Sequence, residues 1–303
     1  MTPIDTSPAR GSARANLRAI GWMLATGLLF AMVTGIARHV GSDMNPIQAA
    51  FIRFAIGLAI LAPVFLRVRF KPRRLGTHGL RGLVHGAAVM LWFYAMARIP
   101  IADVTALGFA TPIYVTIGAV LFLREKLHLR RAAAVLAGFL GVLVILRPGF
   151  EVIQLGAVAQ LVATPLFAVS FIFAKKLTET ETNASIAAYL AVVVTLVLLP
   201  PALVVWRPPT WEELGWLSAI AVLATLGHLA MNQAFRSAEI MVTQPATFLQ
   251  LVWATLIGIV VFGEEPELWI WAGAAIIVAA ATYIARREAV AEVPASDRRG
   301  TFC

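Results

Sequence analysis

The chain has 303 residues, of which 60% are hydrophobic and only 14% are charged, and its mean hydropathy is +0.82. These values exclude an ordinary soluble globular protein and indicate a membrane protein. The net charge of +9 does not indicate nucleic-acid binding, because the Lys and Arg residues fall in short runs between apolar segments. The single cysteine, Cys303, excludes a disulfide framework and a cysteine-based metal site.

Ten apolar segments approach the length of about 20 residues that crosses a hydrocarbon core of about 30 Å. We therefore predict an all-α integral membrane protein with ten transmembrane helices. The predicted spans are Leu17–Ala37, Pro46–Leu66, Gly79–Ala97, Ala102–Leu123, Ala132–Leu146, Ile153–Ala174, Ala184–Val205, Leu214–Phe235, Ile240–Phe262 and Leu268–Ala285.

The distribution of basic residues predicts the orientation of these spans. If the N-terminus is cytoplasmic, most Lys and Arg residues fall in cytoplasmic stretches, and we count Arg81 among them. Because basic residues resist translocation, both termini are predicted to lie in the cytoplasm of a bacterial-type inner membrane. Trp206, Trp211 and Trp216 then gather at the outer boundary, where an indole keeps its ring in lipid and its N–H in water.

A repeat relates the two halves of the chain. Residues 94–126 and 232–265 share an arginine, a Val-Thr step, a long apolar run and a glutamate, Glu125 or Glu264, and the Val-Thr steps lie 138 positions apart (104 to 242). The loop after the first copy is basic and the loop after the second is acidic, as expected for five-helix halves of inverted orientation. We predict tails at residues 1–16 and 289–303, a first repeat at 17–149 and a second at 150–288.

Acidic residues are absent from the middle of every predicted span. All sixteen fall in a tail, a loop, or the first or last turn of a span. A carrier driven by protons or sodium usually holds a carboxylate near mid-membrane, because burying that charge is costly and persists only for a function. The pattern favours a facilitator, an exchanger, or proton linkage through histidine.

Three titratable side chains lie within predicted spans. Arg53 is placed either to pair with a helix-end carbonyl or Asp43, or to contact a substrate carboxylate. His85 is either a packing group or a ligand. His228 and Asn232 lie four residues apart and form a polar stripe on one helical face, which favours a role in lining a pathway.

Prolines interrupt both spans that carry the repeat. Pro112 follows Thr111 near the middle of the fourth span, and Pro245 follows Gln244 and is expected to break the first turns of the ninth. Proline frees a backbone carbonyl, which leaves two alternatives: a packing kink, or a hinge whose carbonyl binds substrate. Gln244, Tyr114 and Trp253 are the nearby side chains that would face a substrate.

The chain resembles the drug/metabolite transporter superfamily, in the ten-span branch built from two EamA repeats. The resemblance rests on the paired repeat cores, the Thr111-Pro112 step, the glutamates Glu125 and Glu264, and the FIRFAIG sequence around Arg53. In length and in lacking a membrane-embedded carboxylate, the chain is similar to YddG-type amino-acid exporters.

The resemblance implies a carrier that alternates access around a central cavity lined by spans one, three, four, six, eight and nine. It implies a pathway near Tyr94, His85, His228, Asn232, Tyr114 and Trp253. It also implies a multi-pass protein that is a monomer or weak homodimer, with a small-molecule substrate and the lipid bilayer as its partners.

The leading functional hypothesis is export of amino acids or similar small amphipathic metabolites. A nucleotide sugar or lipid-linked sugar is the alternative cargo. Binding of its phosphates needs several Lys or Arg side chains in the pathway, and the sequence places only Arg53 there. An integral-membrane transferase is a remote alternative, because the sequence has no DxxD, HExxH or nucleophile motif. We expect no catalytic residue, metal or cofactor.

Overall fold

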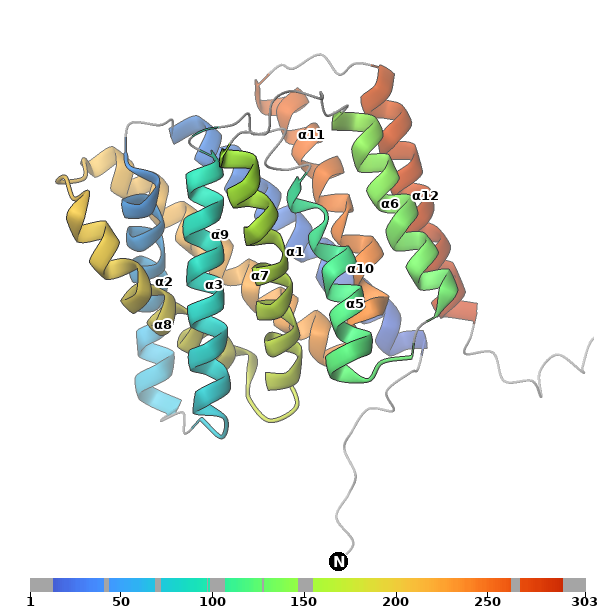
Figure 1. The fold of residues 1–303 in the computed structure, drawn as a ribbon, viewed down its shortest axis with the longest axis horizontal. Coiled ribbons are helices and arrows are strands. Elements are labelled where there is room, and N and C mark those ends of the chain that lie inside the picture. Colours follow the sequence, from blue (N-terminus) through green and yellow to red (C-terminus); the bar gives the residue numbers. More distant parts are fainter. Residues whose placement is uncertain are drawn as a thin grey trace, which may run out of the picture.

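The structure is a computed structural model that describes residues 13–40, 44–68, 72–96, 98, 107–126, 128–146, 155–262 and 268–290. Every regular element in these ranges is an α-helix, which confirms the predicted fold class (Figure 1). The helices are α1 (Ala13–Val40), α2 (Pro46–Val68), α3 (Leu75–Met96), α5 (Thr111–Leu123), α6 (Leu129–Leu146), α7 (Leu155–Leu177), α8 (Asn183–Val204), α9 (Trp211–Ser237), α10 (Ile240–Thr247), α11 (Leu249–Phe262) and α12 (Leu268–Val290).

Each predicted span corresponds to a helix or a pair of helices in the described ranges. The first part of the fourth span lies outside the described residues, and the ninth span is divided into α10 and α11. By length and composition, six of the described helices are able to cross a membrane, with α10 and α11 counted as one. Long apolar helices follow from the sequence because a backbone in lipid must satisfy its own hydrogen bonds.

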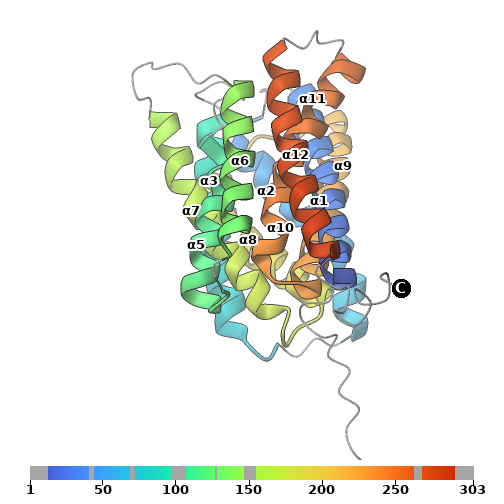
Figure 2. The ribbon, with the colours of Figure 1, turned by 90° about the vertical axis from the view of Figure 1, so that its right-hand side faces the viewer.

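The packing of the helices repeats between the two halves. In chain order α1, α2, α3, α5 and α6 correspond to α7, α8, α9, α11 and α12. Helix α1 packs on α9 as α7 packs on α3, while α2 packs on its counterpart α8 and α6 on its counterpart α12. The last pair lies at one edge of the bundle (Figures 1 and 2).

The two halves run in opposite directions. Helix α5 ends at the lower side of Figure 1, where α1 begins and α12 ends, whereas its counterpart α11 ends at the upper side. A repeat with an odd number of spans requires this arrangement. The lower side is the one that the basic residues predict to be cytoplasmic.

Both repeat-bearing spans are broken at equivalent positions. A turn at Phe109 and Ala110 precedes α5, so Pro112 occupies the first helical turn, where its missing N–H costs least. In the second half α10 ends at Thr247 and the turn falls at Phe248, 138 positions after Ala110. The prediction that Pro245 breaks the first turns of the ninth span is wrong, because Pro245 lies inside α10.

Small residues let α3 approach α8 closely. A Cβ atom added at Gly82 would lie 2.4 Å from Val193 of α8, and one added at Gly86 would lie 2.9 Å from Val197. These distances leave no room for a side chain, so glycine sets the spacing of the two helices. Arg81 and His85 lie on the same stretch of α3 and are positioned by this contact.

Candidate transport site

Two histidines and two phenylalanines meet at the centre of the bundle. The ring centroids of His85 in α3 and His228 in α9 are 5.6 Å apart. Phe30 of α1 packs edge-on against His228, and Phe167 of α7 packs edge-on against His85, both with centroids 5.3 Å apart and planes at 74°. Each half of the chain thus contributes one phenyl and one imidazole with the same geometry. We call these four residues the histidine cluster.

The two imidazoles differ in their hydrogen bonds. Nδ1 of His85 lies 3.1 Å from the Ser170 hydroxyl oxygen of α7, which orients that ring. Nδ1 of His228 is buried and has no partner among the described protein atoms. A buried ring nitrogen without a partner is costly, so His228 offers a hydrogen bond to a ligand or water at the centre.

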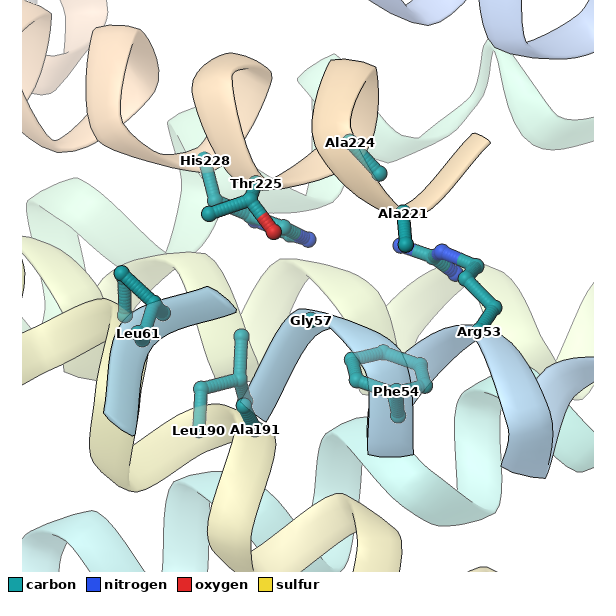
Figure 3. A pocket seen from close by; sticks show the side chains of 11 residues that line it. Arg53, Phe54, Gly57, Leu61, Leu190, Ala191, Ala221, Ala224, Thr225 and His228 are labelled. Carbon is teal, nitrogen blue, oxygen red and sulfur yellow. The ribbon is translucent and has the colours of Figure 1, made fainter. Parts of the chain in front are cut away.

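A cavity opens from the histidine cluster between α2, α8 and α9. Figure 3 shows the Arg53 guanidinium and the His228 imidazole directed into this space from α2 and α9. Its other walls are apolar or small, including Leu190, Ala224 and Thr225, and none of its lining residues is acidic. The space has room for about one water molecule, so a metabolite enters only when the helices move apart.

Arg53 keeps its positive charge beside this cavity. Its guanidinium carbon lies 4.4 Å above the centroid of the Phe54 ring, a cation–π contact. Asp43, which the sequence suggested as a partner, lies outside the described residues. No carboxylate of the described residues forms an ion pair with Arg53, so its charge is free to contact a substrate.

Arg81 is a buried cation that the sequence analysis missed. We counted it among the residues of the cytoplasmic stretches, whereas it lies in the second turn of α3 and its side chain is only 1% exposed. Its Nη1 donates to the carbonyl oxygen of Ile186 at 3.0 Å. The spacing of His78, Arg81 and His85 on one face of α3 was the signal that could have found it.

Two of the other predicted residues lie on the helices that carry the histidines. Asn232 lies one helical turn, about 6 Å, beyond His228 on α9; its Nδ2 donates to the carbonyl oxygen of Asn183 at 3.5 Å, and its buried Oδ1 has no partner among the described atoms. Tyr94 lies about 13 Å along α3 from His85, and its ring carries the Arg98 guanidinium at 3.5 Å.

The remaining predicted residues lie on the broken spans. Tyr114 of α5 is 41% exposed, and its hydroxyl has no hydrogen-bond partner among the described residues. Nε2 of Gln244 donates to the carbonyl oxygen of Ile240 at 3.2 Å, so its amide is turned onto its own helix. Trp253 of α11 has a buried indole N–H without a partner among the described atoms, and it stays a candidate donor to a substrate.

The glutamate that ends the first repeat holds the beginning of α10. Oε1 and Oε2 of Glu125 accept hydrogen bonds from the backbone N–H groups of Ile240 at 2.8 Å and Met241 at 3.2 Å. Burial raises the pKa of the Glu125 carboxyl, and these two N–H groups oppose that rise. A helix N-terminus has unpaired N–H groups, so a residue of the first half caps a helix of the second. Glu264, the counterpart of Glu125, lies outside the described residues.

Further polar contacts join the helices at this end. The Lys175 ammonium donates to the carbonyl oxygens of Phe235 and Ala238 at the end of α9, and Nη1 of Arg131 lies 2.5 Å from Oε2 of Glu239. We call this end, with Glu125, the closed end. At the other end, Gln48 of α2 exchanges two hydrogen bonds with the backbone of Arg207, which precedes α9.

The described residues contain no group of three or more His, Cys, Asp or Glu placed to hold a metal. The histidine cluster and the cavity combine aromatic rings, small or apolar side chains and neutral hydrogen-bonding groups with the charge of Arg53.

The sequence of the chain identifies the protein family. The model of the EamA-like transporter family matches twice, at residues 17–147 and 154–286. The chain belongs to the EamA-like transporter family. This confirms the resemblance to the drug/metabolite transporter superfamily.

Individual relatives are also transporters. The chain is 30% identical to a riboflavin transporter of Vibrio cholerae, over 88% of this chain and 92% of the relative. It is 28% identical to an S-adenosylmethionine uptake transporter of Rickettsia bellii over the same shares, and 25% identical to a pseudopaline exporter of Pseudomonas aeruginosa over 85% and 92%. One crystal structure shares the fold, with a TM-score of 0.73 and 19% identity over 89% of this chain and 98% of that one.

These matches support a small-molecule membrane transporter and do not indicate an enzyme. The relatives differ in substrate and in direction, since their names include uptake and export. Neither the family nor these relatives single out amino acids as the cargo.

Proposed function

We propose that this chain carries a small, uncharged or anionic metabolite with a planar ring system across the cytoplasmic membrane, and that riboflavin is its substrate. The observation that carries the proposal is the histidine cluster, in which four aromatic rings and an unpartnered imidazole nitrogen meet beside two arginines. Aromatic walls with a few directed polar groups are typical of sites for ring-containing ligands.

The positive charge of the interior favours one of the relatives' substrates over another. Arg53 and Arg81 bring positive charge to the centre, and the cavity lining contains no carboxylate. The sulfonium of S-adenosylmethionine would meet like charge there, which disfavours binding. Riboflavin is uncharged, and its flat ring presents several hydrogen-bond acceptors. The interior thus favours riboflavin over S-adenosylmethionine.

Transport then follows from the packing of the two halves. Each phenyl–imidazole contact of the histidine cluster joins the two halves, so moving one half against the other breaks both contacts and makes room for a ring. Such a movement opens one end of the bundle while the other stays shut, which is alternating access around a central site. We infer from the basic residues that the closed end faces the cytoplasm.

Counterflow in proteoliposomes tests the proposal. Vesicles loaded with unlabelled riboflavin should accumulate labelled riboflavin, and excess S-adenosylmethionine or a nucleotide sugar should not compete. His228→Ala should lower the flux roughly tenfold or more, because a buried hydrogen bond and ring contacts are lost. His128→Ala is the matched control, since His128 lies exposed between α5 and α6. A wild-type protein that exchanges another metabolite of the panel and ignores riboflavin would contradict the proposal.

Export of amino acids is the second candidate, and the arginines favour it. A guanidinium in a partly apolar site binds a carboxylate well, and both Arg53 and Arg81 lie near the centre. The cavity lining offers no carboxylate for the ammonium group of an amino acid, which ranks this candidate lower. The same panel, extended to the twenty amino acids, separates the two.

A further inference from the structure

The side chain of Arg81 uses only part of its hydrogen-bonding capacity. Nη1 donates to the carbonyl oxygen of Ile186, while Nε and Nη2 are buried and have no partner among the described atoms. Nε–H and Nη2–H lie on one edge of the planar guanidinium and point in parallel. This edge is the one that binds two neighbouring acceptors at once.

No described carboxylate is paired with this charge. One helical turn earlier on α3, Nε2 of His78 lies 3.8 Å from Oε1 of Glu181. That oxygen already accepts a hydrogen bond from the backbone N–H of Arg73 at 2.6 Å. A buried charge without a partner is costly to keep, and inside a transporter it marks a substrate or ion pathway.

The position of Arg81 places this edge next to the transport site. Ile186, its carbonyl partner, directly precedes Ala187, which lines the cavity beside His228. Arg81 also lies one helical turn, about 6 Å, before His85 on α3, and the His85 ring lies 5.6 Å from that of His228. Arg81 therefore borders the histidine cluster from α3, while Arg53 borders the cavity from α2.

We propose that the Nε/Nη2 edge of Arg81 is a substrate-binding subsite that takes two adjacent acceptors lying in one plane. This inference rests on the proposed function, because it describes how the same site holds its substrate. The ring of riboflavin offers two such edges, N1 with the C2 carbonyl oxygen and N5 with the C4 carbonyl oxygen. The carboxylate of an amino acid has the same geometry, so the chemistry of the subsite is shared by both candidate substrates.

A purely structural role makes a different prediction from a binding role. If Arg81 only holds the Ile186 carbonyl, Arg81→Lys keeps one donor for it and transport is preserved. If the Nε–H and Nη2–H pair binds substrate, Arg81→Lys removes that pair while keeping the positive charge, and substrate binding is weakened. Arg74→Lys is the matched control, because Arg74 lies one-third exposed on the same side of the bundle and bonds the Lys176 carbonyl and Glu179.

The experiment measures riboflavin affinity by competition in the counterflow assay, together with thermal stability in detergent. Arg81→Lys should weaken riboflavin binding roughly tenfold or more, as expected for the loss of hydrogen bonds from a charged donor. Arg74→Lys should leave the riboflavin affinity unchanged. Riboflavin analogues with C–H in place of N1 or N5 supply a second measurement on the wild-type protein. One analogue should bind roughly tenfold more weakly than riboflavin, and Arg81→Lys should erase that difference.

The outcomes separate this inference from the proposed function. Riboflavin flux that is unchanged in Arg81→Lys, or equal affinity for both analogues and riboflavin, would overturn the subsite and leave the function standing. A second outcome is that the wild-type protein carries amino acids and not riboflavin, does not carry amino-acid amides, and loses amino-acid flux in Arg81→Lys. This outcome would overturn the function and support the subsite. A wild-type protein that carries neither class overturns both.

Discussion

The Glu125 cap provides the sharpest test of how this transporter closes. Replacing Glu125 with alanine removes both acceptors from the N–H groups of Ile240 and Met241 at the beginning of α10. In the closed state these groups lie in a partly buried interface, whereas in a state open at this end water reaches them. Loss of a helix cap costs about 1 kcal/mol, so the balance should move toward the open state by a factor of about 5.

The neutral variant should behave differently. Burial raises the pKa of the Glu125 carboxyl despite the two N–H groups, so the negative charge itself is not favoured in the closed state. Glutamine keeps a carbonyl oxygen for one of the N–H groups and needs no buried charge. Glu125→Gln should therefore lie close to the wild type, and Glu125→Ala should not.

Cysteine labelling reads out this balance. With the single native cysteine replaced by serine, Met241→Cys places a thiol at a fully buried position beside the cap. A hydrophilic maleimide should label it about five times faster in Glu125→Ala than in the parent. Glu179→Ala is the control, since Glu179 is a half-exposed surface residue near Arg74. Equal labelling rates in Glu125→Ala and its parent would refute the idea that the cap holds this end shut.

Two further predictions concern α3. Gly82→Ala should lower the free energy of unfolding by about 1–3 kcal/mol, because the added Cβ clashes with Val193. Gly79→Ala should be neutral or stabilising, because the space around its Cβ is open. Adding Val193→Ala to Gly82→Ala should restore the lost stability. If Gly79→Ala and Gly82→Ala are equally stable, the close contact of α3 with α8 is incorrect. Ser170→Ala should lower riboflavin flux less than His228→Ala, because it frees the His85 ring without removing it; flux as low as in His228→Ala would show that the hydroxyl itself binds substrate.

The sequence predicts the helices well because their cause is local. An apolar run of the right length must form a helix in lipid, and this fixes the spans to within a few residues. The break in the ninth span has a different cause. Phe248 stacks on Phe109 of the other half, with centroids 5.8 Å apart, and lies against Gly138 of α6. These contacts come from distant parts of the chain, so the helix ends there and not at Pro245.

The candidate site was only partly predictable for the same reason. His85 and His228 were identified as titratable groups within spans, but they lie 143 positions apart (85 to 228) while the repeat has a spacing of 138, so the repeat does not pair them. Only the packing of α1 on α9 and α7 on α3 brings them together. Arg81 was not counted among the titratable groups within spans because a basic residue near a span boundary usually lies outside the membrane.

Helix α10 links the closed end to the centre of the bundle. It has eight residues, and its ends are both held by the first half: Glu125 caps its beginning, and Phe248, just after its end, stacks on Phe109. It also packs on α1, which carries Phe30 of the histidine cluster. A short buried helix fixed at both ends moves as a unit, so separation at the cap displaces Phe248 and the wall beside Phe30 together. The closed end and the substrate site are therefore expected to respond to one movement, and a Glu125→Ala variant that labels faster should also release riboflavin faster.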